Sequence, residues 1–111
     1  HPGYAAVTLG LLHGSQPDAF VVCHEAGREY VEGFPKCRLP DIPTLIEHTI
    51  ACGRVTNSKI RCAGISINTS ALDNEGRDAL LRELSEQTGL PCVDPVATGV
   101  GPIVDNLEQN F

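Results

Sequence analysis

A histidine and a glutamate lie side by side at His24 and Glu25, directly after a short apolar run. Imidazole and carboxylate groups can exchange protons with a substrate near neutral pH, which general acid–base catalysis requires. The alternative is a histidine that is only hydrogen-bonded at the end of a strand. Arg28 follows, and its planar guanidinium suits a carboxylate or phosphate, unless it belongs to a solvated loop with Lys36 and Arg38.

Three small polar residues, Asn68, Thr69 and Ser70, end a second apolar run, "IRCAGISI". Either they satisfy the free N–H groups of the following helix, or they contact a ligand. An amide side chain such as that of Asn68 offers both a donor and an acceptor, which suits the edge of a nucleotide base.

Asp94 and Pro95 end a third, shorter run and are as typical of a turn as of a ligand contact. The loop "ATGVG" follows and places Gly99 nearby, but GxGxxG and GxxxxGK[ST] patterns are missing, so the anion-binding signal is weak. We expect no metal site, because His48 and Cys52 lack the paired motif of a zinc site. Nucleophilic catalysis by Cys23 is a minor alternative, since an apolar setting keeps a thiol inert.

Composition restricts the partners. The net charge is −6, with 8 basic and 14 acidic residues, so the chain lacks the basic surplus of a nucleic-acid binder. No segment has the roughly 18 apolar residues of a membrane span. Five cysteines without a CxxC pair favour reduced, mostly buried thiols and a cytoplasmic location. We therefore expect a small-molecule substrate, and a homo-oligomer stays an open alternative.

The pattern of apolar and turn-forming residues predicts alternating helices and strands in a single α/β domain over residues 1–111. Helices are expected at 4–13 (buried, ended by Gly14), 41–53, 73–88 and 102–107, and strands at 19–24, 60–67 and 90–93. Asp41 and Asp73 are the expected N-caps. Residues 25–40 read as one long loop. In the third helix we expect Arg77 to point outward, and Asp78 to pair with Arg82.

Strands that alternate with helices are expected to be parallel, with helices on both faces of the sheet. Their C-terminal ends then lie along one edge, where open α/β sheets bind ligands. The sequence therefore predicts that His24, Asn68 and Asp94 lie along a common rim. Small residues on one face of the second strand, Gly64 among them, would let a helix pack closely.

The chain resembles the C-terminal domain of the D-glutamate N-acetyltransferase (DgcN) family, whose members are sometimes labelled NAD-dependent epimerase/dehydratase. Three long, specific runs carry this resemblance over nearly the whole chain: "HPGYAAVTLGLLHGSQPDAFVVCHEAGR", "CAGISINTSALDNEGRDALL" and "GLPCVDPVATGVGPIVDNL". It implies a two-domain protein about three times as long, with a Rossmann-like domain and then a P-loop NTPase-like domain of three α/β/α layers. The family's phosphate loop would precede His1, and the chain contains no Met, so we expect an inactive fragment of a larger enzyme.

A more distant likeness is to dethiobiotin synthetase and related P-loop enzymes, where the Asn after the strand contacts the nucleotide base. By that likeness Asn68 would contact the adenine of a nucleotide or of coenzyme A. The resemblance to the D-glutamate N-acetyltransferase family implies transfer of an acetyl group from acetyl-CoA to the amine of D-glutamate. From the chemistry of the side chains, our hypothesis is that His24 or Glu25 takes the proton of the amine and that Arg28 holds a substrate carboxylate. The residues expected to bind the cofactor are Asn68, Thr69, Ser70, Asp94, Pro95 and Gly99. The alternatives are an ATP- and Mg²⁺-dependent ligase or kinase-like enzyme, and a non-catalytic nucleotide-binding module.

Overall fold

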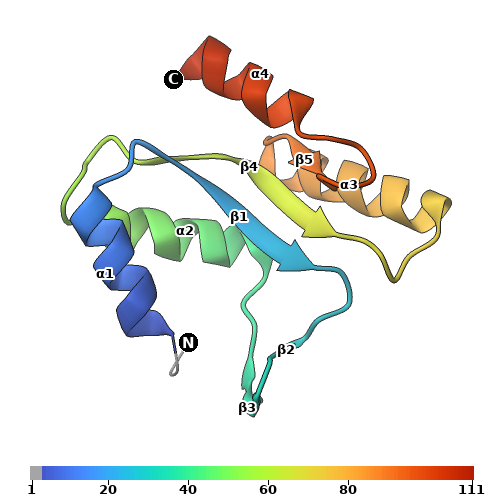
Figure 1. Ribbon diagram of the computed structural model, residues 1–111, viewed down its shortest axis with the longest axis horizontal. Coiled ribbons are helices and arrows are strands. Elements are labelled where there is room, and N and C mark those ends of the chain that lie inside the picture. Colours follow the sequence, from blue (N-terminus) through green and yellow to red (C-terminus); the bar gives the residue numbers. More distant parts are fainter. Residues whose placement is uncertain (1–3) are drawn as a thin grey trace. The chain divides into compact units, whose positions relative to one another are not determined.

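The computed structural model describes residues 4–111, whose helices and strands alternate for most of the chain (Figure 1). In chain order the elements are α1 (Ala5–Ser15), β1 (Ala19–Glu25), β2 (Tyr30–Val31), β3 (Phe34–Arg38), α2 (Ile42–Gly53), β4 (Arg61–Asn68), α3 (Asn74–Thr88), β5 (Cys92–Val93) and α4 (Gly101–Asn110). They fall into two compact units. Unit 1 holds the described residues up to Phe20 and Arg28–Arg61, and unit 2 holds Val21–Gly27 and Cys62–Phe111.

A three-stranded sheet has the order β1-β4-β5, with β4 in the middle. β4 and β5 are parallel, with Ile65 opposite Cys92 and Ser66 opposite Val93, and the arrows of β1 and β4 run the same way in Figure 1. This confirms the predicted α/β class with a parallel sheet. The C-terminal ends of the three strands therefore lie at one edge.

The core of unit 2 is built around β4, whose side chains are covered on both faces. Ile65 and Ile67 are fully buried, and Val93 of β5, Leu81 of α3 and Ile103 of α4 are buried as well. Each such aliphatic side chain contributes roughly 1.5–3 kcal/mol on burial.

Helix α4 packs closely on β4 because β4 carries a glycine at the contact. A Cβ atom at Gly64 would lie 2.7 Å from Cγ1 of Ile103 and 3.0 Å from the carbonyl oxygen of Pro91. Asn106 adds a hydrogen bond from its Nδ2 to the carbonyl oxygen of Ala63, at 2.8 Å. The predicted close packing of a helix on this small-residue face is confirmed.

In unit 1, α2 begins as predicted. Asp41 caps it by accepting from the backbone N–H of Thr44 at 2.8 Å, and Pro43 lies in its first turn. The helix ends at Gly53, where an added Cβ atom would clash with Cδ1 of Ile60.

Two expectations for unit 1 are wrong. The predicted buried helix forms as α1 and packs against α2, but none of its residues is buried, and Val7 and Leu11 are 62% and 69% exposed. The described residues of unit 1 cover too little of a helix that is apolar nearly all round. Its C-cap is Gln16, with a positive φ of 49°, rather than Gly14.

The predicted long loop over residues 25–40 contains an antiparallel hairpin of β2 and β3, in which Tyr30 pairs with Arg38. Gly33 supplies the positive φ of its turn, 78°, and the guanidinium of Arg38 lies 5.8 Å from the centre of the Tyr30 ring. The strands have two and five residues, too few to produce a readable alternation of apolar and polar positions.

Candidate functional site

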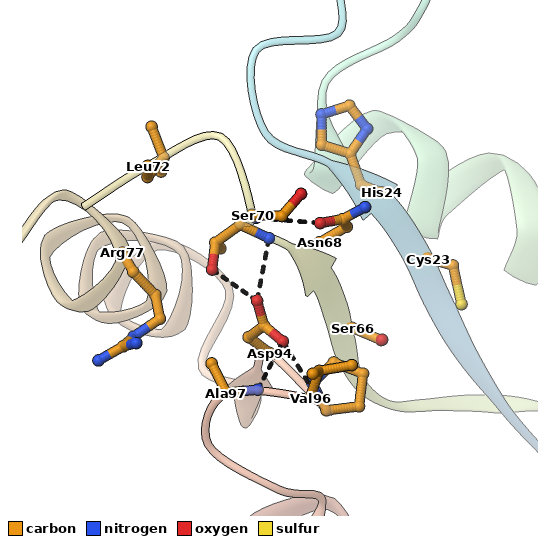
Figure 2. A pocket seen from close by; sticks show the side chains of 12 residues that line it. Cys23, His24, Ser66, Asn68, Ser70, Leu72, Arg77, Asp94, Val96 and Ala97 are labelled. Atoms are coloured by element: carbon orange, nitrogen blue, oxygen red, sulfur yellow. Dashed lines mark hydrogen bonds between the residues drawn. The ribbon is translucent and has the colours of Figure 1, made fainter. Parts of the chain in front are cut away.

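A pocket of about 580 Å³ lies in unit 2, at the C-terminal edge of the sheet (Figure 2). Its walls come from the end of β1, the end of β4 with the loop that follows, the first turns of α3 and the loop after β5. The lining residues are Cys23, His24, Ser66, Asn68, Thr69, Ser70, Leu72, Arg77, Asp94, Pro95, Val96 and Ala97. His24, Asn68 and Asp94 thus share one rim, as the parallel topology predicted.

His24 and Cys23 come from the end of β1, the strand next to β4. His24 is half-buried and Cys23 is exposed. The backbone N–H of Ala26 donates to the carbonyl oxygen of Asn68 at 3.0 Å, which continues the pairing of the two chain segments beyond the strands. The imidazole therefore lines the pocket next to the polar residues that end β4 (Figure 2).

Asn68, Thr69 and Ser70 form a turn and do not cap the next helix. Asn68 Oδ1 accepts from the backbone N–H of Ser70 at 3.0 Å, and the N-cap of α3 is Asp73, which accepts from Gly76 at 2.7 Å. The capping alternative for the three polar residues is therefore wrong. Asn68 and Ser70 are exposed at the pocket, whereas Thr69 is buried.

Asp94 is a buried carboxylate with both oxygens engaged (Figure 2). Oδ2 accepts from the backbone N–H and the hydroxyl of Thr69, at 3.0 and 2.5 Å. Oδ1 accepts from the backbone N–H groups of Val96 and Ala97, at 2.9 and 3.0 Å. These bonds, the Thr69 hydroxyl first, hold the pKa of Asp94 well below its usual range. Asp94 therefore shapes the pocket wall as a charged acceptor.

Three residues of the sequence-predicted site are not in this lining. Glu25 and Gly99 belong to unit 2 but are absent from the pocket wall. Gly99 has a φ of 78° and serves the turn before α4. Arg28 belongs to unit 1, where its Nη2 lies 3.8 Å from Oε2 of Glu32.

Arg77 is the pocket residue that the sequence reasoning assigned wrongly. It was expected to point outward from α3, yet its side chain is only 20% exposed and lines the pocket. Its Nε donates to Asp78 at 2.9 Å, and the expected pair of Asp78 with Arg82 is not formed. Side chains on a helix lean toward its N-terminus, so a long residue in the first turns reaches back toward the strand end. That rule was the signal that could have identified Arg77.

Among residues 4–111, no three His, Cys, Asp or Glu side chains gather in a way that could hold a metal ion. Over the same residues, no helix has the length and apolar character needed to span a membrane.

Comparisons with known proteins agree with this fold. A family model described as "Domain of unknown function (DUF1611_C) P-loop domain" matches residues 1–104. Two curated proteins named D-glutamate N-acetyltransferase match 96% of the chain, one from a Pseudoalteromonas species at 47% identity and one from Tritonibacter scottomollicae at 38%. The crystal structure of a DUF1611 family protein from Anabaena variabilis covers 99% of the chain at 32% identity, with a TM-score of 0.90. The chain spans 32% of the length of each of these three proteins.

Proposed function

Because the chain belongs to the DUF1611 family, as its C-terminal P-loop domain, we propose that it is part of an enzyme that acetylates the amine of D-glutamate with acetyl-CoA as donor. Two relatives that carry the name D-glutamate N-acetyltransferase support the reaction class. The structural observation that supports this reaction in the present chain is the pocket, where a histidine, an amide and an arginine lie at one edge of the sheet.

The chemistry requires a base. The ammonium group of D-glutamate must lose a proton before its nitrogen attacks the thioester carbonyl. The tetrahedral intermediate then collapses, the C–S bond breaks and the coenzyme A thiolate takes up a proton. His24 is the preferred base because it lines the pocket and imidazole titrates near neutral pH. Glu25 is the alternative base and lies outside the pocket lining.

The cofactor half of the proposal centres on Asn68. Its Oδ1 already accepts from Ser70, so its Nδ2 group is the donor for a ring nitrogen of adenine, and Oδ1 keeps one lone pair as an acceptor. Pro95 and Ser70 supply the apolar and polar wall beside it. Thr69 and Asp94 hydrogen-bond to each other, so in this proposal they shape the pocket and do not bind the cofactor directly.

The test uses the complete protein that carries this chain, with acetyl-CoA and a panel of D- and L-amino acids, and mass spectrometry of the N-acetylated product. N-acetyl-D-glutamate should form, and His24→Ala should lower kcat at least ~100-fold, the low end for acid–base catalysis. His48→Ala is the matched control, since His48 is an exposed histidine on α2. Wild-type turnover in both His24→Ala and Glu25→Ala would remove these residues as bases.

The description of the family as a P-loop domain favours a second candidate, an ATP-dependent ligase or kinase-like enzyme. It predicts Mg²⁺-dependent release of ADP or AMP from ATP when D-glutamate or a related acid is present, without use of acetyl-CoA. A non-catalytic nucleotide-binding module predicts nucleotide binding and neither reaction. The same panel, run with ATP and Mg²⁺ in place of acetyl-CoA, separates the three.

A further inference from the structure

We propose that Arg77 binds an oxyanion of the ligand, a carboxylate or a phosphate, in the pocket at the sheet edge, and so determines which anionic substrate is accepted. The inference rests on the proposed function only for the identity of that anion.

The guanidinium of Arg77 is oriented before any ligand binds. Nε donates to Asp78 Oδ1 at 2.9 Å and Nη1 donates to Asn74 Oδ1 at 3.2 Å, both on the first two turns of α3. An arginine has five N–H donors. Since these two bonds use two of them, three remain without a partner in the part of the chain that the structure describes, and a planar fork of this kind matches a carboxylate or phosphate.

The side chain of Arg77 is mostly buried in the pocket wall. Four-fifths of the Arg77 side chain is covered, whereas its partner Asp78 is 56% exposed. A cation near the N-terminus of a helix opposes the helix dipole, so the dipole of α3 is not the reason for an arginine at this position. An arginine whose side chain is mostly covered and lines a pocket meets less competing water, so its spare donors gain more from an anionic ligand than those of an exposed arginine do.

Asp94, the other charged side chain in the pocket lining, does not neutralise Arg77, so Arg77 can bind an anionic ligand there. Both oxygens of Asp94 are engaged by four hydrogen bonds from Thr69, Val96 and Ala97, and no ion pair joins Asp94 to Arg77 within residues 4–111. His24 lines the wall at the end of β1, and Arg77 lines it from α3.

Two anions of the proposed reaction have this chemistry: the carboxylates of D-glutamate and the phosphates of coenzyme A. In the complete protein, the KM for D-glutamate at saturating acetyl-CoA and the KM for acetyl-CoA at saturating D-glutamate are measured for wild type and Arg77→Ala. One of them should rise about 10- to 100-fold, the range for charged hydrogen bonds. A rise for D-glutamate identifies a carboxylate, and a rise for acetyl-CoA identifies a phosphate.

Arg82→Ala is the matched control, because Arg82 lies on the same helix and is exposed; it should leave both KM values unchanged. Arg77→Lys, which keeps the charge and loses the fork, should give an intermediate KM and also serves if Arg77→Ala does not fold. A folded Arg77→Ala variant, checked by circular dichroism, with both KM values at wild type would overturn the inference.

Direct binding separates this inference from the reaction. Calorimetric titration of wild type and Arg77→Ala with D-glutamate, coenzyme A and 3′-dephospho-coenzyme A needs no turnover. If the wild-type protein acetylates nothing but Arg77→Ala still weakens binding of one of these anions, the proposed function fails and the role of Arg77 stands. Equal affinities of the two proteins for all three ligands would reject the role of Arg77.

Discussion

Thr69 places two donors on one oxygen of Asp94, 25 residues further along the chain: its backbone N–H at 3.0 Å and its hydroxyl at 2.5 Å. The contact joins the loop after β4 to the loop after β5. The other carboxylate oxygen binds Val96 and Ala97, and the Thr98 hydroxyl donates to the Asp94 carbonyl oxygen at 2.9 Å. One side chain therefore holds two walls of the pocket together.

Asp94→Asn should destabilise the protein by about 1–3 kcal/mol at pH 7, because an amide cannot accept on both sides and places an N–H2 group against a donor. The folded-state pKa of Asp94 is lowered, so its stabilisation is fully present above the unfolded pKa of about 3.9 and is lost as pH falls toward the folded pKa. Denaturant unfolding of wild type and Asp94→Asn should be measured between pH 7 and pH 2. The difference between their free energies of unfolding should become smaller below about pH 4.

Asp105→Asn is the control for that experiment, since Asp105 is exposed on α4, and it should change stability by less than about 0.5 kcal/mol. A difference between wild type and Asp94→Asn that does not vary with pH would contradict the assignment of Asp94 as a charged acceptor.

Gly64→Ala should destabilise unit 2 by about 1–3 kcal/mol, since the new Cβ meets Ile103 and the Pro91 carbonyl oxygen. The double variant with Ile103→Ala tests whether the clash with Ile103 is the cause. It should lose less stability than the two single variants lose together, by more than about 0.5 kcal/mol. Thermal and denaturant unfolding measure both.

Gly10→Ala, in contrast to Gly64→Ala, should raise the stability of the protein, because no atom of residues 4–111 lies close to an added Cβ at Gly10. Nothing lies within 4 Å of a Cβ at Gly10 in α1, so alanine should stabilise by about 0.5–1 kcal/mol through its better helix propensity. If Gly10→Ala and Gly64→Ala had equal effects, close packing would not be the reason for Gly64.

Asp73→Ala should cost about 0.5–2 kcal/mol, because the N–H of Gly76 loses its acceptor at the start of α3. Asp73→Ser should retain most of the stability, as serine also caps. Glu86→Ala, an exposed change on the same helix, serves as the reference. Urea midpoints of the three variants rank them, and equal midpoints for Asp73→Ala and Glu86→Ala would exclude the cap as a stabilising contact.

The free cysteines should react with iodoacetamide at different rates in the folded protein. Cys23 is exposed, while burial raises the pKa of the Cys62 thiol and raises the pKa of the Cys92 thiol to about 11. At pH 8 only about one Cys92 in a thousand is then a thiolate, the reactive form. Peptide mapping should find Cys23 alkylated well before Cys62 and Cys92, and urea should abolish this difference in rate. If Cys92 is alkylated as fast as Cys23 in the folded protein, the protection of Cys92 by the fold is refuted.

Local patterns predicted much of the fold. The caps Asp41 and Asp73 act on N–H groups three residues away, so their roles could be read from the chain alone. The hairpin around Gly33 was missed because its strands are too short for a pattern. The burial of α1 was predicted wrongly because burial depends on what covers a helix, which its own sequence does not contain.

For the site, the sequence by itself determined which polar residues end each strand and, through the alternation of strands with helices, that they share one edge. Only the tertiary structure decided what each does there. It turned Thr69 toward Asp94, left Asn68 and Ser70 exposed at the pocket and brought Arg77 into the wall. Strand order and register choose hydrogen-bond partners that are distant in sequence, and no local pattern records that choice.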